Sequence, residues 1–327
     1  MPYGTASWRR EELTERCYPR LTEDEPSQQL DLFSDNRRTI WLNQAHEALR
    51  RLDLAGAMAG YAKIIDARLD DERIRQEQEL SWGWHDRLAR YGESSRDAEE
   101  IHRLHAELEE RLPSPLRTAL LEFMVAQLLE VDAPELFYPS PRFHPGLLCH
   151  ELREYDAAAT WFSRGIEAGV RPLGRFLAYQ GDALFRLGNE VTARELYREA
   201  FLREPLTIDL PHLEDLAILE LIDEVENEEE APVEELLPWL PVWGWLTDLF
   251  TLELPPPLSD QTGFHVRPAG EGRTAPLTPS REWFDSLCSA EFLRASSGDG
   301  QELIRVRRRL KELHGGLFRR YMKKMGG

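Results

Sequence analysis

Cysteine is almost absent from this chain of 327 residues. Its three cysteines, Cys17, Cys149 and Cys288, lie far apart, and no two of them form a CxxC pair. A zinc ribbon or a disulfide framework needs closely spaced cysteines, so neither is expected. Residues 1–10 also lack the apolar core of a signal peptide, and we therefore expect a cytoplasmic protein.

Lysine is scarce too, since almost all of the 40 basic residues are arginine. This bias is typical of GC-rich genomes and indicates a bacterial source. No basic residue occurs between Glu204 and Val266, a stretch that includes a glutamate run at 228–230. The net charge of −19 makes nucleic-acid binding over the whole surface an unlikely role.

Sequence motifs for catalysis are also missing. No Walker loop, GxGxxG loop or GxSxG elbow appears. His150-Glu151 is followed by Glu154, where a HExxH zinc site would have its second histidine. His102 and His105 lack a known ligand spacing for a metal. We therefore expect no catalysis, no cofactor and no metal site.

Strand patterns are missing as well, because no segment alternates apolar and polar residues with strong β-branched content. We expect an all-α protein with almost no sheet. Composition predicts four segments: a polar lead-in at 1–36, a helical repeat domain at 37–253, a Pro/Gly-rich linker or loop at 254–280 and a basic helical segment at 281–327.

The strongest positive signal is an internal repeat with a period of 35 residues. Within each copy, small and aromatic residues fall on one face of two successive helices. A period of this length indicates paired helices stacked into an array. The matching pairs are Gly146 with Gly181, Ala158 with Ala193, Phe162 with Tyr197, and Gly165 with Ala200.

This pattern resembles the tetratricopeptide repeat (TPR), a two-helix unit with small residues at its close helix contacts. The resemblance is clearest over 142–170 and 176–205, and weaker over 41–69. The first copy departs from the family at Val170, which stands in place of a closing proline. The resemblance implies a right-handed α-α superhelix of antiparallel helix pairs, followed by a non-repeat helical C-terminal part.

The same resemblance implies a binding groove, because partner peptides of this family usually lie along the first helix of each repeat. An acidic group of the ligand would then face Arg175 and Arg186. Asp182 and Leu147 replace the asparagines of chaperone-binding members, which argues against a chaperone-tail clamp. The implied groove residues are Phe143, Leu147, His150 and Glu151 in the first copy, and Arg175, Asp182, Phe185 and Arg186 in the second.

Two other segments are candidate surfaces. Residues 236–254 are the most apolar stretch, yet prolines and carboxylates interrupt them, so we expect a buried capping helix rather than a membrane span. Residues 301–327 carry nine Lys and Arg against two Glu. We favour docking of this basic helix on the protein's own acidic stretch, 209–235, over contact with an anionic partner.

The sequence as a whole predicts a scaffold or adaptor that binds another protein through a peptide or a partner helix. One alternative is a binder of nucleic acid or of an anionic surface through the basic C-terminal helix. Another is an enzyme with a site near His144, Cys149 and His150. The identity of the partner and the oligomeric state are left open.

Overall fold

A computed structural model describes residues 26–93, 97–108, 110–252, 278–295 and 300–326. These residues are mainly helical and contain one isolated bridge, between Ser140 and Phe143, which confirms the all-α prediction for them. The lead-in up to residue 25 and most of the expected linker at 254–280 lie outside the described residues.

The chain divides into two compact units. The first comprises residues up to Asp86 together with Leu112–Leu116, and the second comprises Arg87–Arg111 and Arg117–Gly327. Two helices, α3 (Glu72–Glu93) and α5 (Ser114–Leu128), contain residues of both units.

In the first unit, α1 (Pro26–Arg50) packs against α2 (Leu54–Asp66). The two helices approach closely where Ala45 faces Gly60, because a Cβ on Gly60 would lie 3.0 Å from the Ala45 Cβ. Asp53 begins α2 by accepting a hydrogen bond from the Gly56 N–H, a typical N-cap contact. The weaker repeat expected at 41–69 therefore coincides with a helix hairpin.

A buried carboxylate on α3 joins this hairpin to the next helix. Glu77 accepts hydrogen bonds from the Tyr61 hydroxyl at 3.0 Å and from Arg73 Nε at 2.8 Å, and its Oε2 lies 2.8 Å from His46 Nε2. These contacts hold the pKa of Glu77 below its usual value even though burial alone would raise it.

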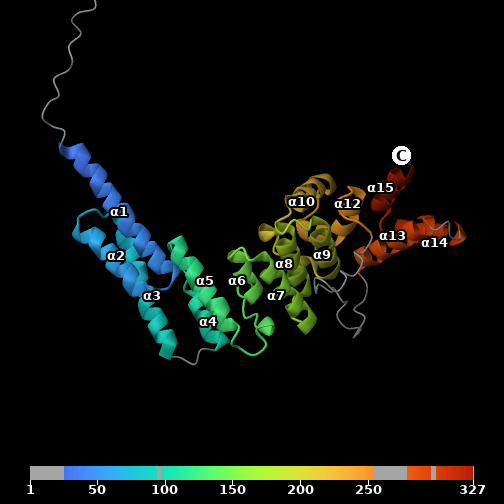
Figure 1. The fold of residues 1–327 in the computed structure, drawn as a ribbon. Coiled ribbons are helices and arrows are strands. Elements are labelled where there is room, and N and C mark those ends of the chain that lie inside the picture. The colour runs from blue at the N-terminus through green and yellow to red at the C-terminus, as the bar shows by residue number, and fades with distance from the viewer. Residues whose placement is uncertain (1–25, 94–96, 109, 253–277, 296–299, 327) are drawn as a thin grey trace, which may run out of the picture. The chain divides into compact units, whose positions relative to one another are not determined.

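The second unit holds the clear repeats and the C-terminal helices (Figure 1). Helices α6 to α9 follow one another as packed neighbours. Its helices are α4 (Ala98–Ala106), most of α5, η1 (Pro134–Leu136), α6 (Pro145–Glu151), α7 (Tyr155–Ala168), α8 (Leu173–Arg186), α9 (Glu190–Arg203), η2 (Pro205–Thr207), η3 (Leu210–His212), α10 (Leu216–Glu229), α11 (Val233–Leu236), η4 (Leu237–Trp239), α12 (Leu240–Leu246), α13 (Pro279–Ala295), α14 (Gly300–Leu313) and α15 (Gly315–Gly326).

Hairpins α6–α7 and α8–α9 use the same contact between a glycine and an aromatic ring. A Cβ on Gly146 would lie 2.7 Å from the Phe162 ring, and one on Gly181 would lie 2.9 Å from the Tyr197 ring. Only glycine lets the second helix of each hairpin come this close. The residues that align at a period of 35 are thus those that set the helix spacing.

The turns inside the three hairpins also match. Leu52, Arg153 and Gly188 each have a positive φ, and each follows its hairpin's small contact residue by the same seven positions. The next amide donates back into the helix just ended: Asn189 N–H bonds Leu184 O and Glu154 N–H bonds Cys149 O, both at 2.9 Å. This is the left-handed helix ending that usually favours glycine.

The tryptophan-rich stretch is broken into short pieces. Pro238 and Pro241 stand at the first turns of η4 and α12, so three short elements replace the single helix expected over 236–254. Trp243 and Trp245 are buried in the core as expected. Among the described residues, no helix combines the length and the apolar character needed to cross a membrane.

The described parts of the expected C-terminal helical segment form three helices, α13, α14 and α15. Trp283 of α13 is fully buried and donates its Nε1–H to Leu310 O of α14 at 3.0 Å. The chain then turns at Gly315, and α15 carries the contacts to the acidic region. Arg320 lies 2.6 Å from Glu228, and Lys324 donates to the carbonyls of Trp245 and Leu246.

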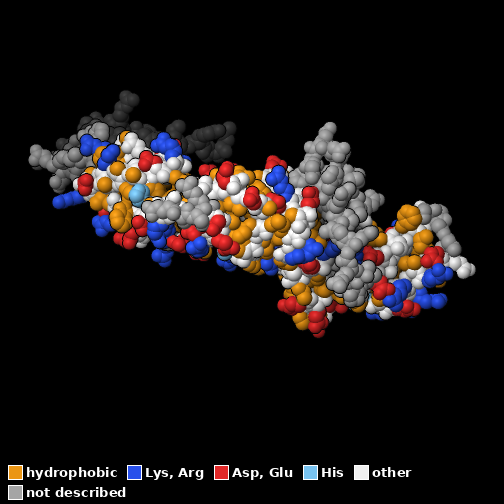
Figure 2. All heavy atoms as spheres, turned by 90° about the horizontal axis from the view of Figure 1, so that it is seen from below, with side chains coloured by type: hydrophobic (Ala, Val, Ile, Leu, Met, Phe, Trp, Pro, Cys, Tyr) orange, Lys and Arg blue, Asp and Glu red, His pale blue; other side chains and the backbone are white. Residues whose placement is uncertain are grey.

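The ion pair of Arg320 agrees with docking of the basic segment on the acidic stretch. The helix that docks is α15, which carries four of the nine Lys and Arg, while α14 carries the other five. Figure 2 shows Lys and Arg side chains gathered over the C-terminal helices on the face it displays. Several of them pair locally, as Arg309 does with Glu282 at 2.6 Å.

Candidate functional site

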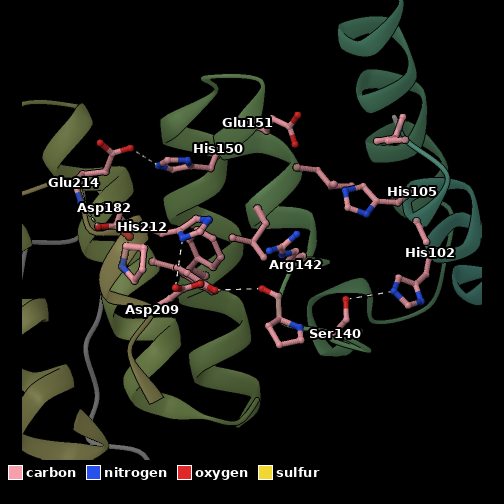
Figure 3. Close-up of a pocket in the computed structure, with 18 of the residues that line it drawn as sticks. His102, His105, Ser140, Arg142, His150, Glu151, Asp182, Asp209, His212 and Glu214 are labelled. Carbon is pink, nitrogen blue, oxygen red and sulfur yellow. Dashed lines mark hydrogen bonds and ion pairs between the residues drawn. The ribbon is translucent and has the colours of Figure 1, made fainter. Parts of the chain in front are cut away.

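A cavity of about 870 Å³ opens in the second unit. Its walls come from α4, the segment 140–142, α6, α8 and the loop 209–214 (Figure 3). Apolar residues such as Leu147, Phe162 and Leu213 share the lining with many charged groups. The charged and histidine side chains of the lining are His102, His105, His150, His212, Arg117, Arg142, Glu110, Glu151, Asp182, Asp209 and Glu214.

The cavity is lined by the first helices of two successive hairpins, α6 and α8. Leu147, His150 and Glu151 come from α6, and Asp182 comes from α8. The proline-rich segment before α6 contributes Ser140 to Arg142, because prolines at 139 and 141 prevent a regular helix there. The repeat helices α6 and α8 therefore form one part of the cavity wall, and the irregular segment 140–142 forms another.

Asp182 is the most deeply placed carboxylate of the lining, with only 4 % of its surface exposed. Its Oδ1 accepts a hydrogen bond from the Tyr197 hydroxyl at 2.6 Å and another from the Glu214 N–H at 3.0 Å. Burial, together with the negative charges of Glu214 and Asp209, raises the pKa of Asp182 to about 7, although these two hydrogen bonds lower it.

The lining histidines differ in their contacts. His102 Nε2 lies 3.3 Å from the Ser140 hydroxyl, and His212 Nδ1 lies 3.4 Å from Asp209. His150 Nε2 lies 3.8 Å from Glu214 and makes no hydrogen bond with the described residues. Burial lowers the pKa of both His105 and His150, so their imidazoles are neutral near pH 7.

Negative charge predominates in the lining, with five carboxylates against two guanidinium groups. Arg117 pairs with Glu151 at 2.5 Å, and Glu214 pairs at 2.7 Å with Arg186, which lies outside the lining. Arg142 is exposed and forms no ion pair with a described carboxylate. The cavity is therefore acidic toward the α8 side, where Asp182 and Asp209 lie.

Half of the groove residues implied by the repeat line this cavity, namely Leu147, His150, Glu151 and Asp182. Phe143 does not, because it is fully buried beneath His102 and His105, with ring centroids 5.0 Å from each. It supports the wall from behind and offers no surface to a partner.

The other three implied residues, Arg175, Phe185 and Arg186, also lie outside the lining. Arg175 donates to Thr207 O at 2.7 Å and to the Tyr138 hydroxyl at 3.2 Å, and Arg186 pairs with Glu214. Both guanidinium groups thus already have partners inside the protein. The expectation that they receive an acidic ligand group is not supported, because the lining itself is rich in carboxylates.

The residues of the proposed enzyme site have structural contacts instead. His144 caps α6, because its Nδ1 accepts from the Gly146 N–H at 3.1 Å while Nε2 donates to Glu135 O at 3.2 Å. Burial lowers the pKa of His144 to about 4 and raises that of the Cys149 thiol to about 12. The thiol therefore stays protonated and is a poor nucleophile.

No group of three or more His, Cys, Asp or Glu side chains within the described ranges is arranged to hold a metal ion. The lining also contains residues that the repeat did not indicate, chiefly Tyr179, Asp209, His212 and Glu214. The last three lie in a loop after the second copy, where the periodic pattern has ended. No sequence signal marks them beyond the onset of the acidic stretch.

Comparisons with protein-family models, with curated proteins and with solved structures give no match to this chain.

Proposed function

We propose that this protein is a scaffold without chemistry of its own, built from hairpins like those of tetratricopeptide repeats. Its cavity would hold a peptide segment of a partner protein. The observation that carries the proposal is the cavity of about 870 Å³, which the first helices of two successive hairpins, α6 and α8, help to line.

The size and the lining of the cavity support this role. Ligand cavities in proteins usually measure about 300–1,000 Å³, so there is room for several residues of an extended peptide. Apolar side chains lie beside carboxylates and imidazoles, which suits the mixed surface of a peptide. The protonated thiol of Cys149 and the capping role of His144 favour binding over an enzyme site at these residues.

Panning a phage library of random peptides against the full-length protein tests the proposal. Ala106, the exposed last residue of α4, lines the cavity, and Ala106→Trp would occupy part of it without disturbing the core. Ala168 is the exposed last residue of α7 and lies outside the lining, so Ala168→Trp is a matched control.

Selected peptides should bind the original protein and Ala168→Trp equally, and should bind Ala106→Trp at least about tenfold more weakly. Peptides that bind all three proteins alike would show that a different surface is used. A library that yields no binder would contradict the peptide-binding role itself.

A further inference from the structure

Asp182, the most buried carboxylate of the cavity lining, has one oxygen that accepts no hydrogen bond from the described residues. Both hydrogen bonds to Asp182 end on Oδ1, from the Tyr197 hydroxyl and the Glu214 N–H. Its Oδ2 accepts none from the described residues, although Asp182 lines the cavity and is only 4 % exposed. Oδ2 is also not one of the fully enclosed polar atoms, so it is open to the cavity, where a ligand can supply its hydrogen-bond donor.

The charges around Asp182 favour a cation as that donor. Asp209 lies in the same wall, and its charge together with that of Glu214 makes it harder to ionise Asp182. A positive group placed at Oδ2 would reverse this effect, because it would balance both carboxylates at once. The lining does contain one guanidinium without an ion pair among the described residues, that of Arg142. Arg142 is exposed, and it pairs with neither of these carboxylates.

The wall beside Asp182 also suits the stem of a long side chain. Tyr179 lies one turn before Asp182 on α8, and its hydroxyl donates to Pro141 O at 3.2 Å, which fixes the ring at the cavity wall. Lysine and arginine carry aliphatic stems that pack on apolar surfaces, and their cations interact favourably with aromatic faces.

Building on the proposed function, we propose that the bound peptide presents a lysine or arginine side chain, whose cation pairs with Asp182 Oδ2 while Asp209 supplies further negative charge. The repeat-based expectation was the opposite, an acidic ligand group. The two ligands differ in charge, so one experiment separates them.

Three phage libraries that differ only in one fixed central residue, Arg, Gln or Glu, are panned against the full-length protein. Cavity binders are identified as those lost with Ala106→Trp and kept with Ala168→Trp. The Arg library should yield these binders. Asp182→Asn should weaken them at least about tenfold, as expected when one partner of a buried charge pair is removed.

Asp182→Asn keeps the Oδ1 acceptor for Tyr197 and Glu214, so the fold should be retained, which circular dichroism checks. Should this variant fail to fold, Asp209→Asn at the more exposed carboxylate should weaken the same binders. Asp223→Asn, an exposed change of equal charge on α10, should leave them unaffected.

The outcomes separate the two proposals. Cavity binders that come from the Glu library, or equally from all three libraries, would overturn the cation site and leave peptide binding in place. Cavity binders from the Arg library that tolerate both Asp182→Asn and Asp209→Asn would also overturn it. Absence of cavity binders from every library would overturn peptide binding itself.

Discussion

The two clear hairpins of this chain share a packing core and differ in their first helices. α8 begins at Leu173, whereas α6 begins only at Pro145, seven residues after the matching position, Tyr138. Prolines at 139, 141 and 145 account for the difference, because they interrupt helical hydrogen bonding. The irregular segment that results lines the cavity, so the candidate site arises where the repeat is broken.

The hairpins also differ in chemistry at matched positions. Tyr197 bonds Asp182 in the second hairpin, and the corresponding residues of the first are Phe162 and Leu147. Arg186 pairs with Glu214, while its counterpart Glu151 pairs with Arg117. The same glycine-to-ring packing therefore occurs with apolar residues at these positions in the first hairpin and with polar residues in the second. The residues that set the helix spacing are thus different from those that set the chemistry of the surface.

The largest effect is expected at the shared glycines. Gly146→Leu and Gly181→Leu should each lower the free energy of unfolding by about 3 kcal/mol, because the new side chain would meet the Phe162 or Tyr197 ring. Chemical denaturation measures the change. Gly92→Leu is the control, because a Cβ at Gly92 has no neighbour within 4 Å and should cause no loss. Equal stability of all three variants would contradict the common packing.

A smaller effect should distinguish the polar pair from the apolar one. Tyr197→Phe removes one of the two hydrogen bonds to buried Asp182 and should cost about 1–2 kcal/mol. Phe162→Tyr should also cost stability, because its hydroxyl would stand at a fully buried position, and the residue matching Asp182 in this hairpin is Leu147. If thermal unfolding shows that Phe162→Tyr does not change stability, then a hydroxyl is tolerated at position 162, and the expected difference between the two hairpins is contradicted.

Per pH unit, the smallest effect is the pH dependence that Asp182 of the second hairpin should cause; His144 of the first hairpin, whose pKa burial lowers to about 4, acts in the opposite direction. The pKa of Asp182 rises from 3.8 to about 7 on folding, so between these values the folded protein keeps a proton that the unfolded chain has released. The contribution of Asp182 to the free energy of unfolding should therefore fall with rising pH across this window, by up to about 1.4 kcal/mol per pH unit.

Asp182→Asn should flatten this slope, and Asp223→Asn should leave it unchanged. The groups that face Asp182 are Tyr197 of α9, Glu214 and Asp209 of the neighbouring loop, and Tyr179 and Arg186 of α8 itself. Part of the slope should remain in Asp182→Asn, because burial also raises the pKa of Glu195 to about 7. An unchanged slope would contradict the buried, protonated state of Asp182.

The hairpins were predictable because their contacts lie between neighbouring helices. Period and spacing placed Gly181, Ala193, Tyr197 and Ala200 on one contact face, and all four are buried. Asp53, Asp70, Gly92 and Pro113, which are residue types that favour helix ends and turns, also lie at or near helix ends. Glycine, proline and capping residues leave local signals that a sequence reveals directly.

The cavity could not be predicted in the same way. Its walls join α4, α6 and the loop 209–214, which are far apart in the sequence and follow no common period. The groove implied by the family placed Phe143 and Arg175 on a free surface, because it took no account of the irregular segment before α6, in which Phe143 lies buried beneath His102 and His105. Tyr138 in that segment contacts both Arg175 and, through its ring, Phe176.

Arg153 and Gly188 both have a positive φ and occupy matching turn positions, so one repeat could be removed between them. Joining Leu152 directly to Gly188 would excise one period while keeping the turn, so that Gly146 would meet Tyr197 as it now meets Phe162. Insertion or deletion of whole periods is thus the change in length that the backbone accommodates best. Such a shortened chain would lose Asp182, so the loss of one repeat would remove the most buried carboxylate of the cavity while leaving a foldable array.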